Sequence, residues 1–360
     1  MTSNEKSGWP QDHGGNIFTG AGQSSILADF SASINPLGHP EGLLDALRER
    51  WQEILHYPDR EVKELRSVLS KEYNLPVDQI LCGNGSAELF ELAFKVVAPR
   101  RLILSPPDFG LYRDRCPEGV EVVEVPRVEG EGFTLDLAGL VSEAREGDMV
   151  LFSNPSNPSG ATAKRDELVK LSNDLRAKGC FLAVDEAFID YSPNEAVLDL
   201  AVEVPGIMVF RSLTKFYGIP GLRLGFLAAS QELVKGMVKL QVPWSVSTVA
   251  QICGVKCFED ESWGPRSREY LERARAKFRS ALEAVPGFKV LPSGANFLLV
   301  KLSPPAPGAT VIYDRLRSAG TLVRHCGSFG LGDEYLRFAV RTVGENADLV
   351  RNINKLMGAL

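Results

Sequence analysis

The sequence has no long hydrophobic run and no run of lysine or arginine. No segment approaches the roughly 20 consecutive apolar residues that a membrane-spanning helix needs, and residues 1–13 are polar, without the apolar stretch of a secretory signal. We therefore expect a cytoplasmic protein with no membrane partner. The formal net charge of -6 disfavours nucleic acid, whose phosphates would repel the chain. The expected partner is a small molecule.

The cysteines lack the regular spacing of a zinc site. We expect no metal, and we expect all of the cysteines to be buried thiols in a reducing compartment. They are Cys82, Cys116, Cys180, Cys253, Cys257 and Cys326.

What the sequence does contain is typical of a globular protein, with 44% hydrophobic and 24% charged residues. At 360 residues the chain exceeds what one hydrophobic core usually organises. We expect an N-terminal segment (1–40) that packs with the small domain and the active site, a large domain (41–245) and a small C-terminal domain (246–360). The Pro-rich residues 303–308 are expected to form a surface loop, because successive prolines cannot continue a strand ladder.

Helical patterns alternate with short apolar runs of strand length, which indicates an α/β fold with a mostly parallel sheet. The strand candidates are residues 101–105, 149–153, 181–184, 207–211 and 224–228, with further candidates in 288–302, 322–325 and 335–340. Three of the first runs end in polar clusters, at residues 154–157, 185–186 and 212–215. Since ligands of such sheets bind outside the carboxyl ends of the strands, we expect these clusters to meet at one site.

Lys215 and Asp185 are the first two candidates for chemistry. Lys215 follows a buried strand directly, and a desolvated lysine stays neutral enough to form a Schiff base. Asp185 ends an apolar run, where a carboxylate needs a cationic partner. Each has a plainer interpretation: Lys215 as a solvated loop lysine, and Asp185 as one half of a salt bridge.

A second group of residues suits an anion such as phosphate. Gly85 and Ser86 begin an apolar helix after a short strand, so backbone N–H groups at the helix N-terminus can hold an anion. Arg223 comes eight residues after Lys215, behind a Gly- and Pro-containing loop, and its guanidinium can bind phosphate through two hydrogen bonds. A Gly-rich turn alone is also a common helix start.

Asn157 and Phe109 complete the set. Residues 154–160 read Asn-Pro-Ser-Asn-Pro-Ser-Gly, a rigid turn that would hold the amide of Asn157 in place as a donor. Phe109 follows Pro-Pro-Asp after a strand, where it could stack on a ring or simply belong to the core.

In this order the motifs resemble those of the fold-type I pyridoxal 5′-phosphate (PLP) enzymes of the aspartate aminotransferase superfamily. The shared features are a Gly-rich helix start, Asn-Pro-x-Asn-Pro-x-Gly, Asp-Glu-Ala-aromatic, Ser-x-x-Lys and an arginine eight residues later. The resemblance covers essentially the whole chain. It implies a large domain with a mostly parallel seven-stranded sheet between helices, and a smaller α+β domain.

The resemblance also implies the role of each candidate toward PLP. Lys215 would bind the cofactor covalently, and Asp185 would pair with its ring nitrogen, which makes the ring a stronger electron sink. Asn157 would contact the ring oxygen and Phe109 would stack on the ring. The phosphate would be held by Gly85, Ser86, Ser212 and Arg223.

Two families share these motifs, the histidinol-phosphate aminotransferases and the L-threonine-O-3-phosphate decarboxylases. The sequence is more similar to the second in residues 13–16, 29–38, 185–190 and 335–342. Phe188 stands where the aminotransferases usually carry a tyrosine that hydrogen-bonds the ring oxygen. The plainer interpretation of Phe188 is a neutral exchange of one aromatic residue for another.

Further residues match substrate contacts of these families. Arg337 matches the arginine that grips the substrate α-carboxylate, and Arg324 matches one that contacts the substrate phosphate. His13 is expected to add to the phosphate site and Asn35 to the carboxylate site, and Asn157 is expected to contact the substrate as well.

Tyr57 matches a tyrosine that reaches the cofactor phosphate of the neighbouring subunit, which implies a homodimer. The alternative for Tyr57 is a structural tyrosine before a turn proline.

The function that the resemblance implies is decarboxylation of L-threonine O-3-phosphate to (R)-1-amino-2-propanol O-2-phosphate in cobalamin biosynthesis. The alternative is transamination of the histidinol-phosphate type. A third class, a cofactor-binding protein without turnover, is disfavoured by the presence of Lys215, Asp185, Asn157 and Arg223 together.

Overall fold

The computed structural model describes residues 14–15, 17 and 28–358. Its strands are β1 (Ala28–Asp29), β2 (Ile80–Asn84), β3 (Arg101–Leu104), β4 (Glu121–Glu124), β5 (Met149–Ser153), β6 (Phe181–Asp185), β7 (Ile207–Ser212), β8 (Leu224–Ala229), β9 (Phe288–Val290), β10 (Phe297–Leu302), β11 (Thr321–Leu322), β12 (Arg324–His325) and β13 (Tyr335–Ala339).

The α-helices are α1 (Leu43–Glu49), α2 (Lys63–Tyr73), α3 (Gly85–Val97), α4 (Leu111–Asp114), α5 (Leu137–Glu143), α6 (Arg165–Ala177), α7 (Leu200–Glu203), α8 (Leu213–Phe216), α9 (Gln231–Leu240), α10 (Thr248–Lys256), α11 (Trp263–Glu283), α12 (Ala309–Ser318) and α13 (Val343–Gly358). Short 3₁₀ turns connect them, among them η3 (Glu129–Glu131) and η7 (Gly327–Phe329).

A seven-stranded sheet organises the larger part of the chain, in the order β2-β8-β7-β6-β5-β3-β4. The pairs from β7 through β6, β5 and β3 to β4 are parallel, whereas β8 runs antiparallel to both of its neighbours. The expected mostly parallel seven-stranded sheet is therefore confirmed. Its parallel strands end at one edge, which brings Ser153, Asp185 and Ser212 to the same side of the sheet.

Helices cover both faces of this sheet because successive strand side chains point in opposite directions. In β5, Met149 and Leu151 pack into a core with α3 and α9, whereas Val150 and Phe152 pack into the opposite core with α6 and α2. Central strands of this kind are buried on both sides, which is why they read as continuous apolar runs in the sequence.

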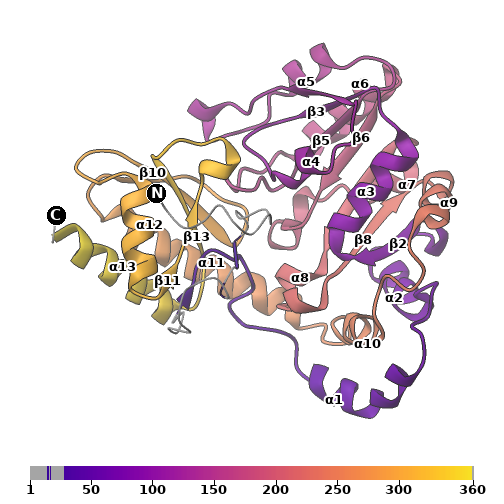
Figure 1. Ribbon diagram of the computed structural model, residues 1–360, viewed down its shortest axis with the longest axis horizontal. Helices are drawn as coiled ribbons and strands as arrows, with labels where there is room; N and C mark the ends of the chain where they lie inside the picture. Colours follow the sequence, from indigo (N-terminus) through magenta and orange to yellow (C-terminus); the bar gives the residue numbers. More distant parts are fainter. Residues whose placement is uncertain (1–13, 16, 18–27, 359–360) are drawn as a thin grey trace.

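A smaller antiparallel sheet, β12-β13-β10-β9, lies with α11, α12 and α13 at the other end of the molecule (Figure 1). The N-terminal strand β1 joins this part by pairing in parallel with β11, and the amide of Ala339 donates to the carbonyl of Phe30. Residues 28–30 thus lie with the C-terminal elements, whereas α10 packs on α1 and α2. The division at residues 40 and 245 stays a proposal.

Strand β4 and Cys116 differ from what the sequence suggested. Strand β4 lies at the edge of the sheet with both ends exposed, so it lacks the apolar run by which the other strands were predicted. Cys116 is half-buried, while the other five cysteines are buried as expected. Residues 303–308 form the predicted loop between β10 and α12.

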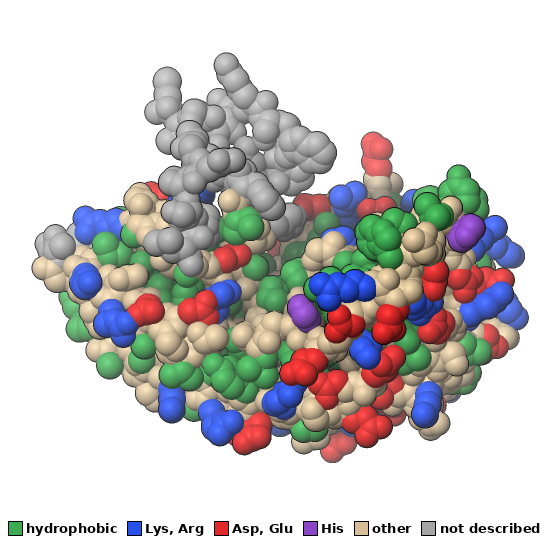
Figure 2. Space-filling model, turned by 90° about the horizontal axis from the view of Figure 1, so that it is seen from below, with side chains coloured by type: hydrophobic (Ala, Val, Ile, Leu, Met, Phe, Trp, Pro, Cys, Tyr) green, Lys and Arg blue, Asp and Glu red, His purple; other side chains and the backbone are tan. Residues whose placement is uncertain are grey.

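On the face that Figure 2 shows, acidic and basic side chains are interspersed and do not gather into a patch of one charge. Within the described part of the chain, no helix has both the length and the apolar composition needed to cross a bilayer.

Candidate active site

Lys215 and Asp185 meet at the carboxyl edge of the large sheet. Asp185 is the last residue of β6, and Lys215 lies in α8, which begins directly after the neighbouring parallel strand β7. The two side chains are close enough for each charge to stabilise the other: Asp185 raises the pKa of Lys215, and Lys215 lowers that of Asp185. The expected encounter of these two distant residues is what the fold produces.

The environment of Lys215 shifts its amine toward the neutral form. Burial lowers its pKa to about 8; Asp185 opposes this shift, and the positive charge of Arg223 adds to it. The Nζ atom donates to the Oγ of Ser212 at 2.9 Å, and Ser212 in turn shares a hydrogen bond of 2.8 Å with Thr214. The neutral fraction of the amine near pH 7 is therefore far larger than that of an ordinary lysine, and the neutral amine is the form that acts as a nucleophile.

Asp185 is held in a buried site by Tyr112, a residue that the sequence did not single out. The hydroxyl of Tyr112 donates to Oδ2 of Asp185 at 2.6 Å, and the amide of Ala187 donates to Oδ1 at 3.0 Å. Burial raises the pKa of Asp185 to about 6, while Tyr112 and then Lys215 act in the opposite direction. Tyr112 comes three residues after Phe109 at the start of α4, a helical spacing that is the one sequence signal for it.

As pH is lowered, we expect Tyr112→Phe to lose PLP affinity at a higher pH than the wild type does. Loss of the hydroxyl removes a hydrogen bond to the ionised carboxylate, so the pKa of Asp185 rises further above its usual range. A cationic ring nitrogen needs the ionised form, so PLP affinity should fall as pH decreases through about 6 in the wild type and from a higher pH in the variant. PLP titrations of the apoprotein between pH 5 and 8 measure this shift. Tyr313→Phe, in α12 of the smaller part, is the matched control, and coinciding pH profiles for Tyr112→Phe and wild type would contradict the assignment.

Gly85, Ser86 and Arg223 lie together at the start of α3, where the sequence predicts an anion site. Gly85 has φ of +74°, and a Cβ on it would lie 2.6 Å from Nη2 of Arg223, so only glycine lets the helix start and the guanidinium approach this closely. Ser86 is buried in the first turn of α3, where backbone N–H groups are available. Since Arg223 also lowers the pKa of Lys215, this predicted anion site lies beside the amine.

Asn157 and Phe109 approach the site from two neighbouring loops. The amide N–H of Asn157 donates to the Oγ of Ser153 at 3.1 Å, and its side-chain Oδ1 accepts from Nη1 of Arg337. Phe109 is half-buried, with its ring 5.6 Å from that of Tyr112 in an edge-on arrangement. Phe109 and Asp185 therefore share the contact residue Tyr112.

Arg337 and Arg324 lie directly opposite each other on the paired strands β13 and β12. Arg337 is 5% exposed, and its guanidinium lies over the ring of Phe297 at 4.9 Å. Its Nη2 donates to the carbonyl of Ser31 at 2.7 Å, while Nε has no partner among the described residues. Burial lowers the pKa of Arg337 to about 10. A buried guanidinium with a spare donor is suited to a carboxylate ligand.

Arg324 is half-buried and borders a cavity of about 740 Å³. Its Nη2 donates to the Oγ of Ser328 at 2.6 Å, and its guanidinium lies 4.9 Å from the centre of the Phe329 ring. Phe109 and Tyr112 also line this cavity. Its lining thus includes both Arg324 and Tyr112, the hydrogen-bond partner of Asp185.

The remaining predicted residues have different outcomes. Asn35 is buried next to Lys215, whose carbonyl accepts its backbone N–H at 3.0 Å. Its side-chain amide already donates to the carbonyl of Phe216 at 2.8 Å and to Ser267 at 3.0 Å, so the geometry favours a role in holding α8 over contact with a substrate. Tyr57 is 77% exposed and lies outside this cluster of side chains. His13 lies outside the described residues.

Comparison with known proteins gives the chain two sets of relatives. The family model described as aminotransferase class I and II matches residues 25–354. Threonine-phosphate decarboxylase from Salmonella typhimurium is 33% identical over 353 residues, which cover 96% of each chain. Histidinol-phosphate aminotransferase from Roseiflexus castenholzii is 34% identical over 337 residues, which cover 90% of this chain and 88% of the relative. Among solved structures, histidinol-phosphate aminotransferase from Sinorhizobium meliloti, in complex with pyridoxal 5′-phosphate, superposes with a TM-score of 0.83 at 21% identity and covers 93% of this chain and 92% of its own.

Proposed function

Because the chain belongs to the aminotransferase class I and II family, we propose that it uses pyridoxal 5′-phosphate to decarboxylate L-threonine O-3-phosphate. The product would be (R)-1-amino-2-propanol O-2-phosphate, a precursor for cobalamin biosynthesis. The observation that carries the choice of substrate is the pair Arg337 and Arg324, opposite each other on adjacent strands.

The side chains at the edge of the sheet fit the cofactor. Lys215 has the lowered pKa needed to react with its aldehyde, and Asp185 offers a carboxylate to its ring nitrogen. The room left by the absent side chain of Gly85, next to Arg223, suits its phosphate together with Ser86 and Ser212. Asn157 and Phe109 would contact the ring oxygen and the ring face. When bound, the cofactor supplies an electron sink for the bond that breaks at the substrate α-carbon.

The residues of this chain would orient the substrate. Arg337 holds the α-carboxylate through Nε and through the edge of the guanidinium that carries Nη1, the atom that contacts Asn157. Arg324, which lies opposite on the neighbouring strand β12, holds the phosphate of the substrate. Lys215 is the group placed to move protons at the α-carbon, because its amine titrates near neutral pH. A substrate that carries both a carboxylate and a phosphate engages both arginines at once.

Transamination of histidinol phosphate is the competing function, and relatives of both kinds have similar identity to this chain. Histidinol phosphate has a phosphate but no carboxylate, so in a transaminase Arg337 would bind a carboxylate only from the amino-group acceptor, such as 2-oxoglutarate. Phe188 also supports decarboxylation: it is buried edge-on against Phe297 at 5.0 Å and offers no hydroxyl to the ring oxygen.

The proposal includes a homodimer. Tyr57 stacks on Trp244, with ring centres 4.5 Å apart, and both side chains are exposed in the single chain. Large apolar side chains nearby in the sequence, Trp51, Leu55 and Val242, are exposed as well. Exposed apolar side chains of this kind suit a protein interface. In the dimer, Tyr57 would reach the cofactor phosphate of the neighbouring subunit.

The decisive experiment gives purified holoenzyme L-threonine O-3-phosphate and no amino-group acceptor. We expect many equivalents of carbon dioxide per subunit, with the cofactor kept in its aldehyde form. One equivalent of pyridoxamine phosphate per subunit, without carbon dioxide, would instead establish the transaminase. Histidinol phosphate with 2-oxoglutarate is the parallel assay for that alternative.

Arg324→Gln is the variant that tests how the substrate is recognised. Loss of a charged contact to phosphate should raise the KM for threonine phosphate by roughly 10- to 100-fold, since a hydrogen bond to a charged group contributes about 1.5–3 kcal/mol. Arg315→Gln, in the last turn of α12, is the matched control. An unchanged KM in Arg324→Gln would remove Arg324 from the substrate site.

A further inference from the structure

A buried ion pair lies directly behind the candidate site. Arg127 donates through Nη2 to Oδ2 of Asp108 at 3.0 Å, and the exposed fractions of the two side chains are 2% and 5%. Arg127 also donates to the carbonyls of Ser105 at 3.1 Å and Ser153 at 2.8 Å. The guanidinium therefore ties together the segments that follow β4, β3 and β5.

The carboxylate of Asp108 is fully used by the protein. Oδ2 accepts from Arg127 and from the amide of Ser153 at 2.9 Å, and Oδ1 accepts from the hydroxyl of Ser153 and from the amide of Phe109 at 2.8 Å. An ionised carboxylate has about four acceptor positions. Asp108 is therefore saturated, and it acts through its neighbours and not on a ligand.

Through these hydrogen bonds Asp108 acts on two of the candidate cofactor contacts, Phe109 directly and Asn157 through Ser153. Asp108 holds the backbone of Phe109, and the Oγ of Ser153 accepts the amide N–H of Asn157 at 3.1 Å. From Asn157 the hydrogen-bonded chain continues to Arg337. One buried carboxylate thus connects the loop that carries the ring-stacking residue, the loop that carries the ring-oxygen donor and the arginine of the smaller sheet.

We propose that Asp108, Arg127 and Ser153, here called the carboxylate clamp, are positioning residues that set Phe109 and Asn157 relative to each other for cofactor binding. This inference rests on the proposed use of PLP, but it does not depend on whether the enzyme decarboxylates or transaminates. The clamp works because a buried ion pair with its hydrogen bonds satisfied allows only one arrangement of the attached loops. Reactive geometry is sensitive to displacements of about 1 Å, so the distance between the two loops matters.

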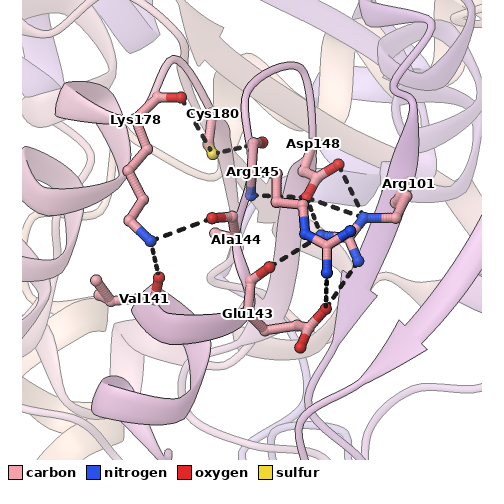
Figure 3. Close-up of polar contacts among 8 residues, drawn as sticks. All are labelled: Arg101, Val141, Glu143, Ala144, Arg145, Asp148, Lys178 and Cys180. Carbon is pink, nitrogen blue, oxygen red and sulfur yellow. Dashed lines mark hydrogen bonds and ion pairs between the residues drawn. The ribbon is translucent and has the colours of Figure 1, made fainter.

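A purely structural ion pair exists in the same sheet and serves as a matched control. Arg101, at the start of β3, donates to Asp148, just before β5, at 2.6 Å, and also to Glu143 at the end of α5 at 2.7 Å (Figure 3). The side chains of Arg101 and Asp148 are 11% and 2% exposed. This pair joins the same two strands as the clamp, but at their opposite ends, away from Lys215.

The experiment compares Arg127→Met with Arg101→Met in the full-length protein, without substrate. Thermal unfolding of the apoproteins, the Kd for PLP and the visible circular dichroism of the bound cofactor are measured. Both variants should unfold at lower temperature than the wild type. Only Arg127→Met should raise the Kd for PLP, by about tenfold or more, and reduce the circular dichroism signal, because only that variant frees Phe109 and Asn157.

Ser153→Ala is the milder variant that keeps the test decisive if Arg127→Met does not fold. It removes the hydroxyl between Asp108 and Asn157 and leaves the ion pair in place. We expect a several-fold higher Kd for PLP with an unfolding temperature close to that of the wild type.

Three results would overturn the clamp: wild-type Kd and circular dichroism in Ser153→Ala, wild-type values in Arg127→Met, or equal losses of PLP affinity in Arg127→Met and Arg101→Met. A wild-type protein that binds no PLP would remove both the proposed function and the clamp. A wild type that binds PLP but transaminates would change only the proposed function.

Discussion

Lys215→Ala should lower multiple-turnover activity with threonine phosphate by about 10⁴-fold or more. General acid–base catalysis by one side chain contributes about 10²–10⁴-fold, and the variant also loses the nucleophile that binds the cofactor covalently. Ser212, the hydrogen-bond partner of Nζ, is a poor substitute because a hydroxyl is a much weaker base than an amine. Carbon dioxide release over many equivalents of substrate is the measurement.

Two controls make the Lys215 result specific. Lys235→Ala, an exposed lysine in α9, should retain wild-type turnover. The circular dichroism spectrum of Lys215→Ala should match the wild type in the far ultraviolet, which excludes misfolding as the cause. Sustained turnover by Lys215→Ala would remove the catalytic assignment.

Asp185→Asn is expected to lower kcat by about 10²–10⁴-fold. Removing one partner of a buried ion pair costs about 3–5 kcal/mol, and each 1.36 kcal/mol corresponds to about tenfold in rate. Asparagine keeps the size of the side chain and one oxygen that can accept from Tyr112, although its amide nitrogen cannot accept from the N–H of Ala187 as Oδ1 of Asp185 does. Steady-state kinetics at saturating PLP measure this loss.

The same substitution should have the opposite effect on the stability of the apoprotein. The pKa of Asp185 is raised from 3.8 to about 6 in the folded protein, so the folded state binds a proton more tightly than the unfolded chain. The stability that this proton provides is present at low pH and is lost as pH rises through about 6. At pH 8, apo Asp185→Asn should therefore unfold at a temperature equal to or above that of the wild type. A lower unfolding temperature together with wild-type kcat would contradict the role given to Asp185.

Much of the candidate site could be predicted because its residues follow buried strands. The apolar runs before Asn154, Asp185 and Ser212 correspond to β5, β6 and β7, and parallel strands place their carboxyl ends at one edge. Residues that come directly after such strands therefore lie close to one another at this edge. Arg324 and Arg337 were named from the family resemblance, and the structure then placed them opposite each other on β12 and β13.

Other parts of the site could not be predicted, because they depend on which partner a polar side chain chooses. Tyr112 donates to Asp185 across 73 positions of the sequence. Asn35, expected near the substrate carboxylate, donates instead to Phe216 and Ser267, and no local pattern distinguishes these choices. The strand β4 was missed for a related reason, since an edge strand with exposed ends has no continuous apolar run.

The sequence by itself determined the order of elements, the mostly parallel sheet and the group of residues at its carboxyl edge. These follow from local chemistry: apolar runs become buried strands, and the residues after them stand at the strand ends. Only the tertiary structure decided the electrostatics of the site. The pKa values of Lys215 and Asp185 depend on the water removed by packing, and the saturation of Asp108 depends on donors from β5 and from the segment after β4. Burial and long-range hydrogen bonds are properties of the assembled fold, because they exist only once distant segments have excluded solvent from one another.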